Sequence, residues 1–397
     1  MNERRAALRG PIGVLAAISF VSQLGIAIML PLIPLYALSL GASPIVLGLL
    51  TASFSVASAL GQLGAGYLID GLGPRRFIRA GIGGYAVMNG LIATATSAGQ
   101  LIAYRSLAGL SAGANLVSTR VYVAGVSDPR RLAFTNGILS AASSAGSVVG
   151  PAVGGLVAAA SNLSVPFAIV GATSGIAFLA SLRLPPVPPS AVAHATAAHT
   201  PTYGRPVLVL LASNLFLLMG FGGFITTYAP FATMRLGWTT TDVGIIFSIF
   251  GLGDITLGPW LGHLADRTGR RRMAMLASLP IAFFGIGVVL GLPRPVLYAL
   301  TLLTGGGLTA FNGSWFALLT SVVPAERRGR VFGTVSAVSN AGTVIGAIGA
   351  SLIWQALDVS GGLILASAAC LAAGGTLIFL PGEAVRPVPA VPATPPA

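Results

Sequence analysis

Long runs of apolar residues recur along the whole chain, and they limit its possible folds more than any other feature. Most runs reach the ~20 residues that an α-helix needs to cross the apolar core of a bilayer. Charged residues make up 8% of the 397 residues, whereas soluble proteins carry roughly 25%. The chain therefore lacks the charge to cover a water-facing surface, and we expect an all-α membrane protein with twelve transmembrane helices. The expected helices are near residues 11–38, 45–66, 77–97, 100–122, 134–159, 164–182, 206–232, 242–264, 273–292, 295–322, 331–356 and 361–380.

The arginines are divided unevenly between the two ends of these helices. Eighteen of the 22 basic residues lie at the termini or in the even-numbered hinges, whereas the odd-numbered hinges hold only Arg235 and Arg294. Because basic residues gather on the cytoplasmic side of membrane proteins, we expect a multi-pass protein of the bacterial inner membrane with both termini in the cytoplasm. The net charge of +13 then reflects orientation in the membrane and does not indicate nucleic acid as a partner.

A repeat at a spacing of 196 residues runs through the chain. Its most distinctive part is the pattern Gly-x-x-x-Asp-x-x-Gly-x-Arg-Arg, found in the expected hinges after the second and eighth helices. The same spacing relates Pro34 to Pro230 and Gly150 to Gly346, so the register holds over more than 100 residues. The residues of the pattern are Gly66, Asp70, Gly73, Arg75 and Arg76 in the first copy, and Gly262, Asp266, Gly269 and Arg272 in the second.

The repeat predicts two six-helix bundles of the same topology, related by an axis along the membrane normal. We expect one bundle at 1–182 and another at 206–381, joined by a cytoplasmic linker at 183–205 that is rich in Pro and Ala. The Pro-rich tail at 382–397 is expected to be disordered. In the first hinge, Gly66 allows a neighbouring backbone to approach closely, Asp70 can cap the third helix, and Gly73 helps to turn the chain.

The repeated pattern and the six-plus-six layout resemble the major facilitator superfamily over nearly the whole chain apart from the linker and the tail. The resemblance implies two pseudo-symmetric bundles that transport a small molecule along a path between them. It also implies that the repeated hinge latches the bundles together on the cytoplasmic face when the cavity faces outward. The alternative is a structural turn whose arginines merely follow the positive-inside bias.

The fifth expected helix carries a glycine pattern of its own. Small residues four positions apart form a groove for a neighbouring helix, and a proline removes one backbone hydrogen bond and bends the helix. The pattern is similar to that of proton-coupled exporters, which favours the 12-helix drug:proton antiporter branch. Generic close helix packing is the alternative. The residues are Gly146, Gly150, Pro151, Gly154 and Gly155.

Two ionisable residues inside the expected helices are candidates for proton coupling, because intramembrane charges cost about 2.5–3.5 kcal/mol on insertion scales and are usually functional. Arg105 fits the fourth-helix pattern of the superfamily, although an arginine so near the helix start can instead reach the outer headgroups. Asp254 is the one carboxylate deep in an expected span, about 18 Å along the eighth helix. Burial disfavours its charged form, as suits a proton carrier. Alternatively, Asp254 forms a structural ion pair with Arg105 or Arg120.

The expected cavity has few polar or aromatic candidates to line it, and each of them alone is also compatible with ordinary helix–helix bonding. As a set they suit a lipophilic substrate better than a sugar or a polyanion. The candidate lining residues are Gln23, Asn115, Tyr228, Asn312, Trp315 and Asn340.

These observations predict a secondary active transporter that exports hydrophobic or amphipathic small molecules in exchange for protons by alternating access. A facilitator or proton symporter that imports a small metabolite is one alternative, and a membrane sensor that has lost transport is another. The sequence contains no nucleotide-binding loop. We expect a monomer in the lipid bilayer, without enzymatic activity, cofactor, metal site or nucleic-acid partner.

Overall fold

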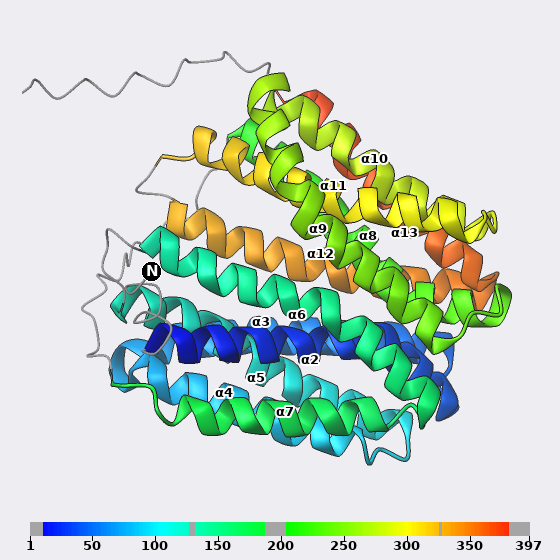
Figure 1. The fold of residues 1–397 in the computed structure, drawn as a ribbon. Helices are drawn as coiled ribbons and strands as arrows, with labels where there is room; N and C mark the ends of the chain where they lie inside the picture. The colour runs from blue at the N-terminus through cyan, green and yellow to red at the C-terminus, as the bar shows by residue number, and fades with distance from the viewer. Residues whose placement is uncertain (1–10, 127–131, 187–203, 325–327, 381–397) are drawn as a thin grey trace, which may run out of the picture.

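The computed structural model of the chain describes residues 11–126, 132–186, 204–324 and 328–380. Over these residues it contains twelve α-helices and one short 3₁₀ helix, drawn in Figure 1. The expected all-α fold is thereby confirmed. The tail at 382–397 and most of the linker at 183–205 lie outside the described residues. The first half contains α2 (Pro11–Ser39), α3 (Pro44–Leu72), α4 (Pro74–Ile92), α5 (Ala98–Val126), α6 (Leu132–Ala160) and α7 (Val165–Ser181). The second half contains α8 (Arg205–Arg235), α9 (Thr240–Thr268), α10 (Arg270–Val289), α11 (Arg294–Val322), α12 (Arg328–Ala356), α13 (Val359–Thr376) and η2 (Leu377–Phe379).

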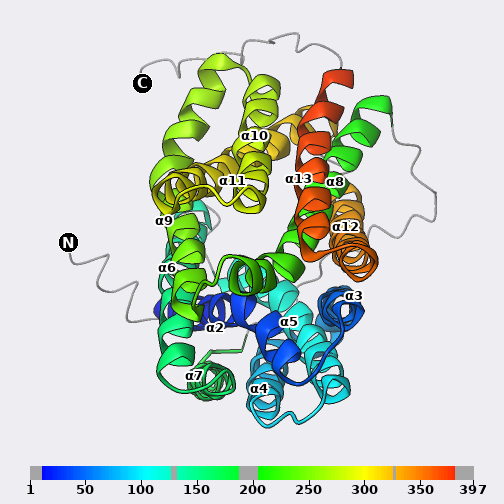
Figure 2. The same cartoon turned by 90° about the vertical axis from the view of Figure 1, so that its right-hand side faces the viewer.

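The helices form two bundles with the same internal packing. In the first half, α3 packs on α5, α2 on α6, and α4 on both α5 and α7. The corresponding pairs of the second half are α9 with α11, α8 with α12, and α10 with both α11 and α13. Between the bundles, α6 packs on α9 and α3 packs on α12. Figure 2 shows these two seams on opposite flanks of the molecule.

The repeat of 196 residues reappears in the details of the backbone. Gly73 and Gly269 both end a helix with a positive φ, of 77° and 97°, a conformation that suits glycine because it has no Cβ. Arg75 donates a hydrogen bond to the Leu182 carbonyl oxygen at 3.4 Å, and Arg271 donates one to the Ile378 carbonyl oxygen at 2.7 Å. The two acceptors are also 196 residues apart, so the duplicated sequence builds duplicated structure.

The hinge between α3 and α4 is shorter than the sequence predicted. We expected a turn over about ten residues, but α3 continues through Asp70 to Leu72 and α4 begins at Pro74. The Gly73 amide donates to the Ile69 carbonyl oxygen at 2.7 Å, so this single residue makes the turn. The expected cap by Asp70 is wrong, because Gly73 is the N-cap of α4 and no side chain caps it.

Eight of the described helices are long and apolar enough to cross a membrane by length and composition: α2, α3, α6, α8, α9, α10, α12 and α13. The other four, α4, α5, α7 and α11, are either shorter or richer in glycine and polar residues, and they pack inside the same two bundles. The chain is accordingly a multi-pass membrane protein.

Candidate functional site

The two bundles meet tightly where α6 approaches the start of α9, which we call the closed end. A methyl group added at Gly244 of α9 would overlap the Pro151 carbonyl oxygen of α6, and one added at Gly155 would overlap the Thr240 carbonyl oxygen. The Ala152 amide of α6 donates to the Ser248 hydroxyl of α9 at 3.0 Å. Contact this close leaves no room for a Cβ atom at Gly155 or Gly244, so glycine is required at both positions.

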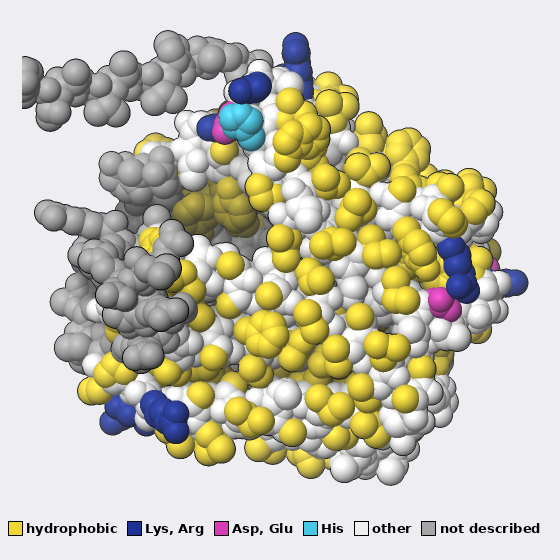
Figure 3. Space-filling view, in the orientation of Figure 1, with side chains coloured by type: hydrophobic (Ala, Val, Ile, Leu, Met, Phe, Trp, Pro, Cys, Tyr) yellow, Lys and Arg dark blue, Asp and Glu magenta, His cyan; other side chains and the backbone are white. Residues whose placement is uncertain are grey.

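Away from the closed end, α6 and α9 separate toward the start of α6 and the end of α9, which we call the open end. Ser140 and Ala141 of α6 lie on the face that contacts α9 nearer the closed end, yet both are exposed. On α9, Ile255 and Pro259 continue the face that touches α6 and are exposed as well. Figure 3 shows a hollow between the bundles in this region, with hydrophobic side chains inside it.

The opposite seam, between α3 and α12, stays in contact along more of its length. Near the closed end, a methyl group added at Gly48 would lie 2.8 Å from the Ala347 carbonyl oxygen. Much nearer the open end, the Ser336 hydroxyl donates to the Gln62 side-chain oxygen at 3.0 Å. The bundles therefore part mainly along α6 and α9, and the gap between them is open at one end only.

Asp254 of α9 is partly buried where this helix crosses α11 within the second bundle. Phe247, two turns earlier on the same face, contacts Phe224 and Tyr228 of α8 at ring-centroid distances of 6.0 and 5.7 Å. The Thr309 hydroxyl of α11 donates a hydrogen bond to the Asp254 carboxylate. A tight glycine crossing sets this pair, because Gly305 packs on the Phe250 backbone one turn before each partner.

The ion pair that the sequence left open for Asp254 does not form. The ion pairs within the described residues join Arg235 to Asp358, Arg270 to Asp266 and Arg294 to Asp242. Asp254 is partly buried and takes its hydrogen bond from a neutral hydroxyl.

Arg105 of α5 is buried against α3 in the first bundle. Its guanidinium carbon lies 4.2 Å from the centre of the Phe54 ring of α3, and its Nε is buried without a hydrogen-bond partner. Gly109 packs directly on the Phe54 backbone and so fixes this approach. The side chain thus packs inward on an aromatic ring and does not extend to the headgroups, which was the alternative. Leu116, three turns further on the same face, is 43% exposed.

The candidate lining residues differ in their surroundings. Gln23 donates to the Ser147 hydroxyl at 2.9 Å, Asn115 accepts from Thr119 at 3.2 Å, and Asn340 donates to the Ser336 carbonyl oxygen at 2.8 Å. Each of these amides bonds within its own bundle. Asn312 is partly buried. Tyr228 was expected to line the cavity, but it is completely buried in an aromatic cluster, and its hydroxyl has no hydrogen-bond partner.

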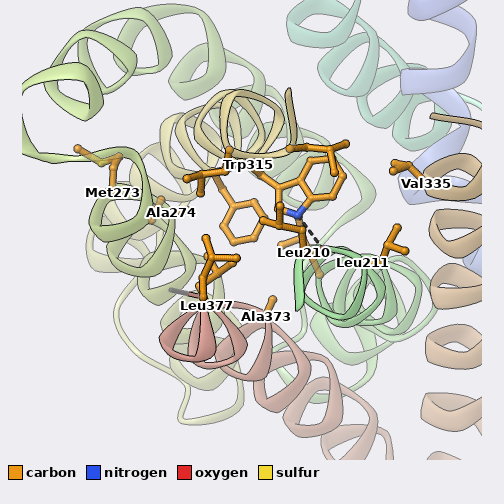
Figure 4. Packing of buried hydrophobic residues seen from close by; sticks show 14 of the residues in the cluster. Leu210, Leu211, Met273, Ala274, Trp315, Val335, Ala373 and Leu377 are labelled. Carbon is orange, nitrogen blue, oxygen red and sulfur yellow. Dashed lines mark hydrogen bonds between the residues drawn. The ribbon is translucent and has the colours of Figure 1, made fainter. Parts of the chain in front are cut away.

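Trp315 is a correction to the expected lining. Its side chain is 2% exposed and lies in the hydrophobic core of the second bundle, between residues of α8, α10 and α13, as Figure 4 shows. Its indole N–H donates to the Leu210 carbonyl oxygen at 2.9 Å. An indole satisfied in this way holds α11 to α8, and Trp315 does not face the gap.

The fifth-helix glycines of the sequence pattern have two different partners. Methyl groups added at Gly146, Gly150 and Gly154 would lie 2.7, 2.8 and 3.0 Å from carbonyl oxygens of α2, within the same bundle. Gly155 instead faces α9 of the other bundle, next to Pro151 in the closed seam. The pattern thus combines a packing face inside the first bundle with a contact between bundles.

The repeated signature lies near the open end of the molecule. The predicted close approach at Gly66 is absent, since a methyl group added at Gly66 or Gly262 would meet nothing within 4 Å. The physical reason is that the bundles are apart at this end. Asp266 pairs with Arg270 at 3.4 Å. Arg76 and Arg272 are exposed, whereas Arg75 is partly buried against the end of α7.

Sequence reasoning missed three residues of the site, namely Thr309, Phe54 and Ser248. Each is an ordinary residue in an apolar helix, and its role depends on a partner in another helix. The sequence contained a signal for Thr309 and Phe54, because the 196-residue repeat relates the crossing of Phe54 with Gly109 to that of Phe250 with Gly305. No such signal marks Ser248.

Comparisons with known proteins agree with this architecture. A family model described as "Major Facilitator Superfamily" matches residues 15–239 and 210–396. The quinolone resistance protein NorA of Staphylococcus aureus is 27% identical over 244 residues, which cover 58% of this chain and 62% of NorA. The match thus spans less than two thirds of that relative. The multi-drug resistance efflux pump PmrA homolog of Lactococcus lactis is 27% identical over 353 residues, which cover 82% of this chain and 84% of that protein.

Solved structures share the fold. The crystal structure of a point mutant of the nucleoside transporter NupG aligns with a TM-score of 0.79 at 14% identity, covering 94% of this chain and all of that one. The human organic anion transporter MFSD10 aligns with a TM-score of 0.66 at 19% identity, covering 93% and 99% of the two chains. At these identities the likeness concerns the arrangement of helices alone.

Proposed function

Because this chain belongs to the Major Facilitator Superfamily, we propose that it is a secondary active transporter that exports hydrophobic or amphipathic small molecules in exchange for protons. The names of two relatives, a quinolone resistance protein and a multidrug efflux pump, support the exporter reading. The apolar lining of the gap supports a lipophilic substrate.

One observation carries the proton coupling: the partly buried carboxylate of Asp254, on a helix that borders the gap, bonds to a neutral hydroxyl and to no cation within the described residues. The negative charge of this carboxylate in a low-dielectric gap is costly. A proton removes the charge and changes the relative stability of the two conformations of the bundles. Arg105, a buried cation of the first bundle, is the second charged member of the coupling site.

The orientation follows from the charges at the two ends. The signature arginines surround the open end, whereas Arg235 and Arg294 lie at the closed end. With the positive-inside bias, the open end is cytoplasmic in the inner membrane. The gap then faces the cytoplasm, where an exporter loads its substrate. The signature hinges would come together as a latch when the bundles close on this side.

In the proposed cycle, Asp254 takes up a proton while the gap faces outward and releases it after the bundles have rocked inward. The deprotonated, inward-facing protein binds substrate and carries it out. Each positive charge that moves inward is favoured by about 2.3 kcal/mol per 100 mV of membrane potential. The proton gradient and the potential therefore both drive export.

The test replaces Asp254 with Asn, which keeps the size and the hydrogen bond but removes the titratable group. Inverted membrane vesicles are energised with a pH gradient, and uptake of three lipophilic fluorescent dyes is followed, one neutral, one cationic and one anionic. We expect wild-type protein to accumulate at least one dye and Asp254→Asn to accumulate none above the background. Asp358→Asn, at the closed end, is the matched control and should retain uptake.

Unchanged pH-driven uptake by Asp254→Asn would remove Asp254 from the mechanism. Dye movement in the opposite direction under the same gradient would indicate the importing alternative. Detergent-solubilised Asp254→Asn should elute as wild type in size-exclusion chromatography, which separates loss of coupling from loss of fold.

A further inference from the structure

Arg105 is a buried cation without an anion. Its Nε has no hydrogen-bond partner, and its guanidinium carbon lies 4.2 Å from the centre of the Phe54 ring. A cation over an aromatic ring gains less than a guanidinium that binds a carboxylate through two parallel hydrogen bonds. Arg105 therefore lacks the two parallel hydrogen bonds to a carboxylate that would stabilise its charge most.

No carboxylate of the described residues supplies that interaction. Asp242, Asp266 and Asp358 pair with other arginines at the ends of helices. Asp70 lies 16 residues beyond Phe54 on α3, about 24 Å along the helix. Asp254 belongs to the other bundle and accepts from Thr309. Each described acid is thus distant from Arg105 or bonded elsewhere.

The surroundings of Arg105 form a site for an aromatic or aliphatic body with one anionic group. The Tyr85 hydroxyl is within electrostatic range of the guanidinium and donates to the Met29 sulfur at 3.6 Å. Phe54 covers one face of the guanidinium, and Leu116, three turns further along the same face of α5, is 43% exposed. Such a lining accepts a hydrophobic molecule and leaves the guanidinium to fix its charged group.

We propose that Arg105 and Phe54 form a substrate subsite that binds the carboxylate of amphipathic organic acids, so that anionic lipophilic compounds are the preferred cargo. This inference rests on the proposed export function and names its substrate class. The carboxylate of the substrate supplies the negative charge that Arg105 lacks. Exporting a monoanion while one proton enters moves two positive charges inward per cycle, so the membrane potential assists this cargo more than a neutral one.

The test compares two probes with the same ring system, 2-naphthoate and its neutral amide, 2-naphthamide. Binding to the purified full-length chain in detergent is measured by isothermal titration calorimetry near neutral pH, without any gradient. We expect wild-type protein to bind 2-naphthoate at least about 10-fold more tightly than 2-naphthamide, as a charge-assisted pair implies. Arg105→Gln should reduce this preference to about 1-fold and leave the affinity for 2-naphthamide within about 2-fold of wild type. Arg105→Lys should keep part of the preference.

Arg120→Gln is the matched control, because Arg120 is an exposed arginine of the same helix and has no role in the subsite. It should retain the wild-type preference. The proposal is overturned if wild type binds neither probe, if it binds both equally, or if Arg120→Gln loses the preference as fully as Arg105→Gln. An equal loss of both probes in Arg105→Gln would give Arg105 a structural role. Where Arg105→Gln fails to fold, the wild-type preference and Arg105→Lys decide.

The outcome is separable from that of the proposed function. Proton-driven uptake of the neutral dye by wild-type vesicles, together with equal binding of the two naphthalene probes, would leave export standing and remove the anion subsite. Selective binding of 2-naphthoate without any proton-driven uptake would support the anion subsite and contradict the proposed export function.

Discussion

The closed seam between α6 and α9 predicts how adding a single methyl group changes the populations of the conformations that are closed and open at this end. Three glycines of α9 form a graded series along one helix. A methyl group added at Gly244 would overlap the Pro151 carbonyl oxygen and lie 3.3 Å from the Gly155 Cα, both of which are backbone atoms. At Gly251 the closest atoms are at 3.1 Å, and at Gly262 nothing lies within 4 Å. Gly→Ala gains helix propensity at every site and in both conformations, so this contribution cancels.

The expected magnitudes follow from these distances. Overpacking against rigid neighbours costs about 1–3 kcal/mol, and the backbone of α6 can move away from Gly244 only if the bundles part at the closed end. A cost of about 2 kcal/mol in the closed conformation alone raises the population open at this end by about 30-fold. For Gly251→Ala we expect less than about 1 kcal/mol, or about 2- to 5-fold, and for Gly262→Ala no change.

The assay uses a reporter on α3, away from the α6–α9 seam, where α3 contacts α8 of the other bundle. The Thr51 hydroxyl oxygen of α3 lies 3.3 Å from the Thr226 hydroxyl oxygen of α8 in the closed conformation. A Thr51→Cys reporter, in a background where the buried Cys370 is replaced by Ala, reacts with a membrane-impermeant maleimide from the outside only when the closed end opens. The labelling rate should rise in the order Gly262→Ala, Gly251→Ala, Gly244→Ala. Equal rates for Gly244→Ala and Gly262→Ala would refute the reasoning.

Two further predictions concern stability. Trp315→Ala should lower the midpoint of thermal unfolding in detergent, because emptying a buried indole site costs about 3–5 kcal/mol; a midpoint equal to that of wild type would contradict its place in the core. Hydrogen bonds from Ser360 and from the Arg235 guanidinium hold the pKa of the Asp358 carboxyl below its ordinary range. Its stabilising contribution is therefore complete above about pH 4 and is lost as the pH falls through the lowered pKa. Because the pair is exposed, the destabilisation in Asp358→Asn should be at most about 1 kcal/mol at neutral pH and should shrink in acid, measured as unfolding midpoints across pH.

Much of the architecture could be read from the sequence because the bilayer imposes it. Long apolar runs in lipid must be helices that satisfy their own backbone hydrogen bonds. The 196-residue repeat then predicts equal bundles, and Gly73 and Gly269 fulfil the same turn in each. The family could be recognised from the repeated signature, because the spacing of its residues reflects the turn that both copies make.

The sequence did not predict which side chains of different helices contact one another. In a soluble helix a buried face is apolar and an exposed face is polar, but in lipid both faces are apolar, so periodicity does not separate core from cavity. Trp315 was therefore assigned to the cavity although it lies in the bundle core. The partner of Asp254, Thr309, is 55 residues away and is set by a glycine crossing whose rotation the sequence alone does not define.

The most direct test of the central claim, that Asp254 carries the proton exchanged for substrate, is proton release on substrate binding. If the deprotonated state binds substrate, linkage requires that substrate binding expels the proton. A dye that wild-type vesicles accumulate is added at saturation to purified protein in weakly buffered detergent solution, and the pH is followed with an indicator. The account predicts release of up to about one proton per wild-type chain and none from Asp254→Asn. Equal release from the two proteins, with equal dye binding, would contradict it.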